Sequence, residues 1–151
     1  MLVLLALAAV IAVAGCTGNS ENPSTQPTAS PTETPNDFSL TVGQTDPFPN
    51  PASLYQVVLN INRNSLTPAI EVEYAGGAGT DRIVTIDVTL YRADDKQVIT
   101  QTFTSPKQRD VLKFTGSSTP FVEDRIKAVA HYTTGETVVI SDALYKYRDT
   151  K

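Results

Sequence analysis

The sequence predicts an all-β fold in which two antiparallel sheets pack face to face. Apolar and polar residues alternate in runs such as Val84-Ile86-Val88-Leu90, with the period of two expected of a strand that has one buried face. Val, Ile and Thr, which favour strands, supply 30 of the 96 residues in 53–148. No stretch of that region repeats apolar residues at helical spacing over a helical length. We therefore expect residues 53–148 to form one β domain.

Turn-forming residues separate the apolar runs and set the strand boundaries. The first run, Val57-Leu59-Ile61, ends before the turn residues from Asn64 to Pro68. The later alternating runs are Ile70-Val72-Tyr74, Val84-Ile86-Val88-Leu90 and Ile126-Ala128-Ala130-Tyr132. The later turn signals are Gly76 to Gly79, Asp94-Asp95, Ser105-Pro106, Gly116 to Pro120 and Thr134-Gly135. Together they predict seven strands, near residues 54–62, 69–75, 82–92, 97–104, 109–115, 124–133 and 136–146.

Seven short strands of this kind resemble the immunoglobulin-like and fibronectin-III-like sandwich, and a small barrel is the second choice. The resemblance is architectural. The chain has no tryptophan and no cysteine within 53–148, so it lacks the Cys…Trp…Cys core of true immunoglobulin domains.

The N-terminal segment, residues 1–15, is typical of an export signal. Fourteen of its fifteen residues are apolar and none is charged, but the run is shorter than the roughly 20 residues that a membrane-spanning helix needs. Val13-Ala14-Gly15-Cys16 resembles the lipobox of prokaryotic lipoproteins, in which an aliphatic residue and two small residues precede the cysteine. The resemblance implies cleavage before Cys16 and a lipid on its thiol. The alternatives are a plain signal peptide cleaved nearby and an uncleaved anchor.

The cysteine count supports the lipobox independently. Cys16 is the only cysteine, and in an exported protein a single thiol would be open to oxidation or unwanted pairing. Acylation consumes that thiol. The expected location is the outer face of the cell membrane, with the domain extracellular and the lipid on Cys16 as its membrane contact.

Residues 16–52 are expected to form a linker between the lipid and the domain. Of the twenty residues in 17–36, eight are Ser or Thr and four are Pro. Proline at this density removes amide donors, and a segment with so few apolar side chains cannot offset its ordering entropy. This part of the linker is therefore predicted to be a disordered stalk.

The second part of the linker, residues 37–52, has a different pattern. Phe38, Leu40 and Val42 alternate with polar residues, and a Pro-rich run follows. The pattern predicts a short strand or clamp against the domain edge, with further linker as the alternative. Residues 149–151 are a short tail. The combination of lipobox, stalk and one β domain resembles the small surface lipoproteins of archaea.

Charge argues against a nucleic-acid partner. The formal net charge is −4, and residues 53–151 hold 12 acidic and 12 basic side chains, so no basic excess is available for phosphates.

The residues that carry chemistry predict no catalytic, metal or cofactor site. His131 is the only histidine, and by parity it lies on the outward face of its strand. Gly76 to Thr80 lacks the Gly-Lys-Ser/Thr of a phosphate loop and precedes a strand, so we expect a turn. The carboxylates of Glu71 and Glu73 are read as a solvated face rather than a calcium site, because no calcium-loop pattern occurs.

The sequence favours a non-catalytic surface module that binds a protein or glycan partner or supports envelope assembly. The alternatives are a small-ligand-binding lipoprotein of a transporter and, ranked lower, a hydrolase on a sandwich scaffold. We expect the partner to contact the connections that point away from the tether, through Asp94, Asp95 and Phe121. This expectation assumes that the tether joins the opposite end, and it competes with Phe121 as a buried core residue.

Overall fold

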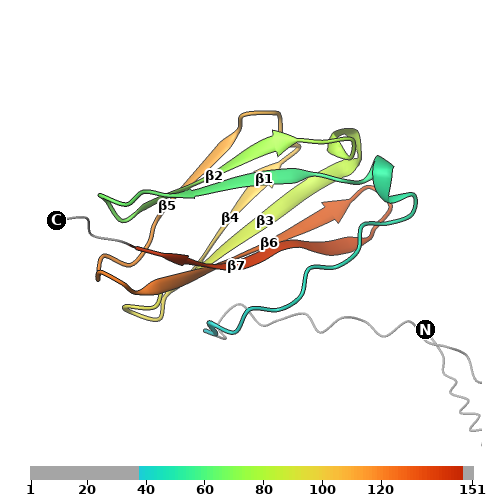
Figure 1. Ribbon diagram of the computed structural model, residues 1–151. Coiled ribbons are helices and arrows are strands. Elements are labelled where there is room, and N and C mark those ends of the chain that lie inside the picture. The colour runs from blue at the N-terminus through green and yellow to red at the C-terminus, as the bar shows by residue number, and fades with distance from the viewer. Residues whose placement is uncertain (1–37, 148–151) are drawn as a thin grey trace, which may run out of the picture. The chain divides into compact units, whose positions relative to one another are not determined.

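The computed structural model describes residues 38–147 as a sandwich of two antiparallel sheets (Figure 1). The predicted signal segment, the lipobox with Cys16, the stalk and the tail fall outside these residues. The strands are β1 (Val58–Arg63), β2 (Ala69–Gly76), β3 (Ile83–Tyr91), β4 (Val98–Thr104), β5 (Val111–Thr115), β6 (Glu123–Tyr132) and β7 (Thr137–Lys146). Two short 3-10 turns, η1 (Ala52–Leu54) and η2 (Thr80–Arg82), precede β1 and β3.

One sheet has the strand order β1-β2-β5 and the other β4-β3-β6-β7. All strand pairs are antiparallel. The chain crosses between the sheets after β2, after β4 and after β5, whereas the other neighbours are joined as hairpins. The all-β class, the seven strands and the immunoglobulin- and fibronectin-III-like sandwich are thereby confirmed.

The core lies between the sheets and follows the predicted alternation. Its residues with no exposed surface are Ile70, Val72, Tyr74, Ile86, Val88, Leu90, Ile126, Ala128 and Ala130. The prediction that Val84 belongs to the same face as Ile86, Val88 and Leu90 is wrong. The register between β3 and β6 shifts between Ile83 and Thr85, so Ile83 is buried and Val84 is exposed. A bulge of this kind moves one residue to the other face of a strand.

Residues 39–46, here called the strap, run antiparallel to β7 along its outer side (Figure 1). The strap is extended but forms no regular strand. It has the predicted position of a clamp, because its hydrogen bonds reach Arg125, Val139 and Asp142.

The strap determines the course of the described part of the linker. β1 begins at the predicted end of the sandwich, where Tyr132 donates a hydrogen bond to the Tyr55 carbonyl. The strap itself runs along the sheet away from that end, and its Ser39 carbonyl accepts a hydrogen bond from Arg125. Arg125 pairs with Tyr91, the last residue of β3. The described part of the linker thus joins β1 at the expected end, but its first residues lie farther along the sheet, beside Arg125.

Candidate functional site

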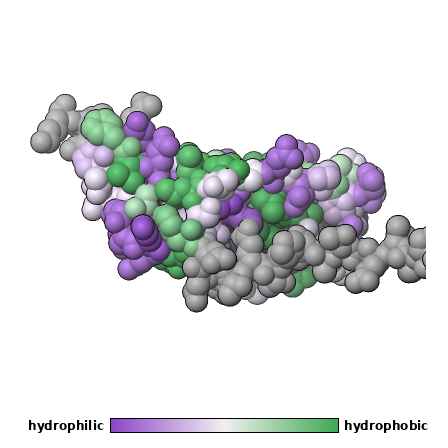
Figure 2. Space-filling model, turned by 90° about the horizontal axis from the view of Figure 1, so that it is seen from below, coloured by the Kyte–Doolittle hydropathy of each residue, from purple (hydrophilic) through white to green (hydrophobic). Residues whose placement is uncertain are grey.

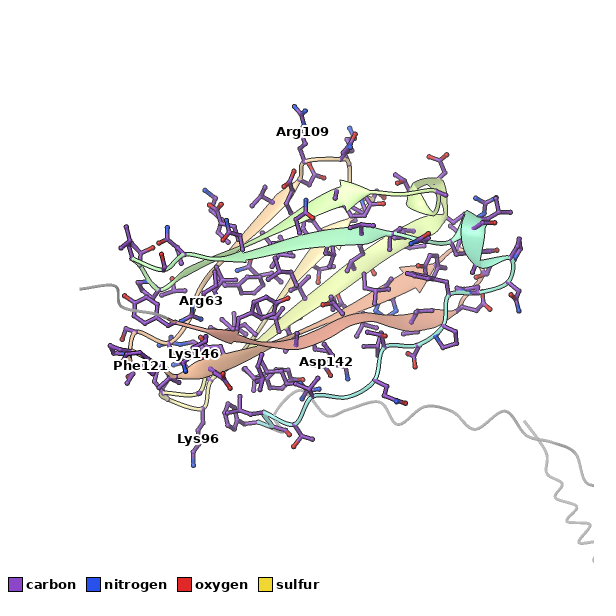
Figure 3. The ribbon with its side chains drawn as sticks, viewed as in Figure 1. Arg63, Lys96, Arg109, Phe121, Asp142 and Lys146 are labelled. Atoms are coloured by element: carbon purple, nitrogen blue, oxygen red, sulfur yellow. The ribbon has the colours of Figure 1, made fainter. Side chains whose placement is uncertain are left out.

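Three loops meet at the end of the sandwich opposite the start of β1: residues 64–68, 92–97 and 116–122. We call this region the loop end. Two backbone amides of the second loop, those of Ala93 and Asp94, donate to the Ser117 hydroxyl in the third. The Tyr147 hydroxyl donates to the Leu66 carbonyl in the first loop. These bonds hold the loops together at one end of the scaffold, where Figure 3 shows Phe121 and Lys146 projecting.

A buried ion pair connects the two sheets beneath the loop end. Arg63 from β1 bonds Asp124 from β6, and the Asp124 side chain is 0% exposed. The Asp124 carboxylate also accepts the Ser117 amide at 2.7 Å, the Ser117 hydroxyl, and the Ala93 amide at 3.0 Å. Because a carboxylate is stable in a dry interior only when its oxygens are satisfied, these donors and the guanidinium hold it in place.

Gly116 is required by the same network. A Cβ atom at this position would overlap the Arg63 guanidinium and the Asp124 carboxylate. The third loop thus turns tightly around the ion pair, and its backbone carbonyl at Ser117 accepts a second bond from Arg63 at 2.7 Å. Hydrogen bonds to the buried ion pair consequently fix the third loop to the interior of the domain.

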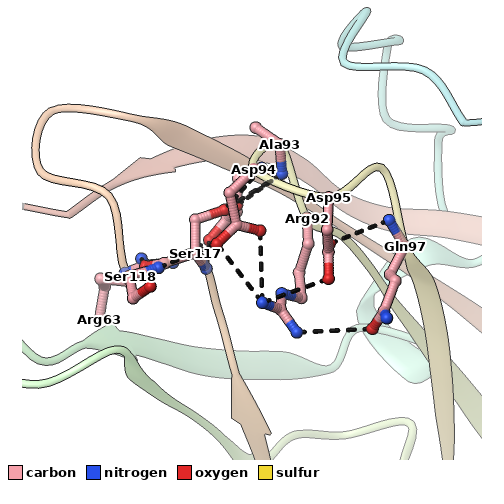
Figure 4. A network of polar contacts seen from close by, with 9 residues as sticks. Arg63, Arg92, Ala93, Asp94, Asp95, Gln97, Ser117 and Ser118 are labelled. Atoms are coloured by element: carbon pink, nitrogen blue, oxygen red, sulfur yellow. Dashed lines mark hydrogen bonds and ion pairs between the residues drawn. The ribbon is translucent and has the colours of Figure 1, made fainter.

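Asp94 and Asp95, two of the predicted contact residues, are bonded to neighbouring loop residues (Figure 4). Arg92 lies 3.3 Å from Asp94 and 3.4 Å from Asp95, and Asp94 also accepts the Ser118 amide at 3.2 Å. Although burial raises the pKa of Asp94, its hydrogen bonds from Ser118 and Arg92 outweigh that effect and lower the pKa below its ordinary value. Asp94 therefore holds the second and third loops together.

Phe121 is exposed, contrary to the alternative in which it plugs the core. Its side chain is 67% exposed, and that of Leu66 is 68% exposed. Within residues 38–147 these are the two most exposed large apolar side chains. Phe121 has a φ of 65°, which is costly for a bulky residue, and its amide donates to the Tyr147 carbonyl at 2.9 Å. The Lys146 ammonium lies 5.6 Å from the centre of the ring. The structure thus brings Asp94, Asp95 and Phe121 to one end, as expected.

His131 lies on the outer face of the four-stranded sheet, as its parity predicts, but it has partners there. Its Nε2 is 3.0 Å from the Asp87 carboxylate and its Nδ1 is 3.2 Å from the Thr137 hydroxyl. Thr102 donates to the other oxygen of Asp87 at 2.6 Å. These four side chains come from the four strands of the sheet, and their hydrogen bonds connect neighbouring strands. No group of three or more His, Cys, Asp or Glu side chains within residues 38–147 is arranged to hold a metal ion.

The site residues predicted from the sequence did not include Arg63, Asp124 or Ser117. A signal for the first two was present: Arg63 follows Ile61 by two residues and Asp124 precedes Ile126 by two, so both charges stand at core-facing positions. Two buried positions of opposite charge favour a pair.

In the part of the chain that the structure describes, no helix has the length and apolar character needed to cross a membrane. No protein-family model matches the chain, and no curated protein matches it.

Proposed function

We propose that the chain is a non-catalytic, lipid-anchored module of the outer cell surface whose loop end binds a protein or glycan partner. The anchor follows from the sequence Val13-Ala14-Gly15-Cys16 and from the absence of any other cysteine. The Thr/Pro-rich stalk supplies a spacer between the lipid and the domain.

Binding at the loop end is supported by the exposure of Phe121 and Leu66 on loops that lie over a buried ion pair. Scattered exposed apolar residues are ordinary, but these two project from the same end, on loops connected to Tyr147. Beneath them the Arg63–Asp124 pair fixes the scaffold. Apolar and aromatic side chains on rigidly held loops lose little entropy on binding, which makes them effective contact residues.

The anchor is tested with Cys16→Ser in the full chain. We expect the wild-type protein to sediment with membranes and its intact mass to equal residues 16–151 plus acyl groups. The variant should lose the acyl mass and leave the membrane fraction. A mature N-terminus elsewhere, or unchanged membrane retention of the variant, would refute the lipid anchor.

The binding surface is tested by crosslinking on intact cells followed by mass spectrometry. Phe121→Ser and Leu66→Ser should each reduce the crosslinked partner at least about fivefold, the effect of truncating a contact residue that contributes more than 1 kcal/mol. Val111→Ser is the matched control, because Val111 is an exposed apolar residue on β5. Equal loss in the control, or no loss in either loop variant, would assign the partner to another surface.

A second candidate, a hydrolase, has one observation in its favour. His131 lies between the Asp87 carboxylate and the Thr137 hydroxyl, an order that resembles the acid, base and nucleophile of a catalytic triad. The test is turnover of activated esters by the purified chain. A rate that disappears in both His131→Ala and Thr137→Ala would establish this activity, and a rate equal to that of buffer would dismiss it.

A further inference from the structure

The strap is held mainly through its backbone. The Arg125 guanidinium donates to the Ser39 carbonyl at 3.1 Å, and the Gly43 amide donates to the Asp142 carboxylate at 2.8 Å. The Asp46 amide donates to the Val139 carbonyl at 2.9 Å. Only one of the four bonds uses a strap side chain, namely the Asp46 carboxylate, which accepts the Val139 amide at 2.8 Å. Contacts of this kind suit extended peptides of many sequences.

The groups that hold the strap are fixed by the sheet itself. Arg125 and Asp142 form a two-pronged ion pair, with N···O distances of 2.7 and 2.6 Å. Both side chains are almost completely buried, and the guanidinium carbon lies 4.8 Å from the centre of the Tyr91 ring. Burial raises the pKa of Asp142, but the bonds from Arg125 and the Gly43 amide outweigh it and keep the pKa below its ordinary value. The site therefore presents a charged donor and acceptor without rearrangement.

The strap fills this site loosely. Residues 41–47 are exposed, and a hollow of about 280 Å³ remains between the strap and the sheet. The strap contributes Ser39, Thr41, Gly43 and Gln44 to its lining, and the sheet contributes Tyr91, Arg125, Lys127, Val139 and Asp142. Seen from below, this side of the molecule combines apolar and hydrophilic side chains (Figure 2), and Figure 3 shows Asp142 between β7 and the strap.

We propose that the strap site is a recognition site for an extended peptide segment of a partner protein, and that the strap occupies it as an intramolecular ligand. The partner segment enters along β7 and replaces the strap's backbone hydrogen bonds. This surface is separate from the loop end, and the inference does not depend on partner binding there.

The contacts specify the chemistry of the partner segment. Glycine is favoured at the place of Gly43, because a Cβ there would lie 3.2 Å from the Asp142 carboxylate. Aspartate is favoured three residues later, where it pairs with the Val139 amide. A larger side chain at the place of Thr41, which lines the hollow, fills space that the strap leaves open.

The test uses a dye-labelled peptide with the sequence of residues 37–47 and the full-length protein in detergent. Gly43→Pro with Asp46→Pro removes both strap amide donors and the Asp46 carboxylate, while the sheet side of the site is unchanged. Thr45→Pro is the matched control, because Thr45 is an exposed strap residue outside these four bonds. If the strap occupies its site at least nine-tenths of the time, releasing it strengthens peptide binding at least about tenfold.

Peptide variants identify the contacts. Asp46→Ala in the peptide should weaken binding to the released protein several-fold, whereas Thr41→Leu should strengthen it. Three results would each overturn the proposal. The first is equal binding to wild-type, control and released proteins. The second is no binding to a released protein that still melts cooperatively. The third is self-association of the wild-type protein that the released variant lacks, which would assign the site to the strap of a second copy.

Discussion

The two ends of the sandwich are closed by different chemistry. At the loop end, the charged pair Arg63–Asp124 bridges the sheets under the loops. At the opposite end, which we call the tyrosine end, neutral tyrosine hydroxyls donate the connecting hydrogen bonds. The Tyr132 hydroxyl donates to the Tyr55 carbonyl at 2.9 Å, and the Tyr74 hydroxyl donates to the Thr80 hydroxyl at 2.8 Å. The rings of Tyr55 and Tyr132 meet edge to face with centroids 5.4 Å apart.

This difference predicts which end of the sandwich each kind of perturbation destabilises. A buried ion pair is vulnerable to the loss of one partner, because the other charge stays behind without compensation. A buried tyrosine tolerates the loss of its hydroxyl better, but it resists ionisation. Mutation should therefore damage the loop end most, and alkali should damage the tyrosine end.

The largest effect is expected from Asp124→Ala. It leaves the Arg63 guanidinium buried without its carboxylate and should cost about 3–5 kcal/mol of unfolding free energy. Urea denaturation followed by far-ultraviolet circular dichroism measures the loss.

The double variant Arg63→Met with Asp124→Leu is the control for this prediction. The Nε of Arg63 is buried and finds no hydrogen-bond partner among the described residues, so the wild-type pair is not fully satisfied. The apolar replacement removes the buried charges and should recover part of the stability, but not all of it, because the buried Ser117 amide loses its acceptor. A double variant as unstable as Asp124→Ala would show that the network's shape, rather than its charge, closes this end.

Alkali should open the tyrosine end. Burial raises the pKa of Tyr132 from 10.0 to about 12, with smaller contributions from Tyr74 and Glu136. The folded state therefore disfavours the phenolate, so this contribution to stability is complete below pH 10.0 and is lost as the pH rises toward about 12. Tyrosinate absorbance and circular dichroism, recorded together, should change in one step. Tyr132→Phe should make the alkaline loss shallower, and an unchanged curve would contradict this assignment.

Acid should loosen the loop end by a smaller amount. The folded-state pKa of Asp94 lies below its ordinary 3.8, so its contribution is present above that pH and is lost as the pH falls below it. Asp94 is partly solvated, so Asp94→Asn should cost no more than about 1 kcal/mol at neutral pH. The variant should lose less stability between neutral and acidic pH than wild type does. If the unfolding free energy of the two proteins fell equally with decreasing pH, the acid sensitivity would come from another group.

The smallest effect on stability is expected from Phe121→Ser. The side chain is mostly exposed, so unfolding free energy should change by no more than about 0.5 kcal/mol. Phe114→Ser is the matched comparison, because Phe114 is buried in β5 and truncating a buried phenylalanine costs about 3–5 kcal/mol. If Phe121→Ser were as damaging as Phe114→Ser, Phe121 would belong to the core.

The strands were predictable from sequence because one side of each sheet is buried and the side-chain period of two records it. The bulge at Ile83 was not, since a single shifted residue leaves the surrounding pattern intact. Arg63 and Asp124 stood at core-facing positions, but parity alone does not show that two strands far apart in sequence bring them together. The exposure of Phe121 depends on its positive φ and its bond to Tyr147, neither of which leaves a mark in the local sequence.

The course of the strap has a mechanical consequence. A pull on the chain at Phe38, directed away from the sheet, loads the bond to Ser39 first, then the bond to Gly43, and those to Asp46 last. Bonds loaded in series break one at a time and therefore at low force. The eight freed residues would add roughly 27 Å of extended chain before the load reached Phe48, which packs against the core. Under such a pull, the strap should therefore detach at low force while the sandwich stays folded.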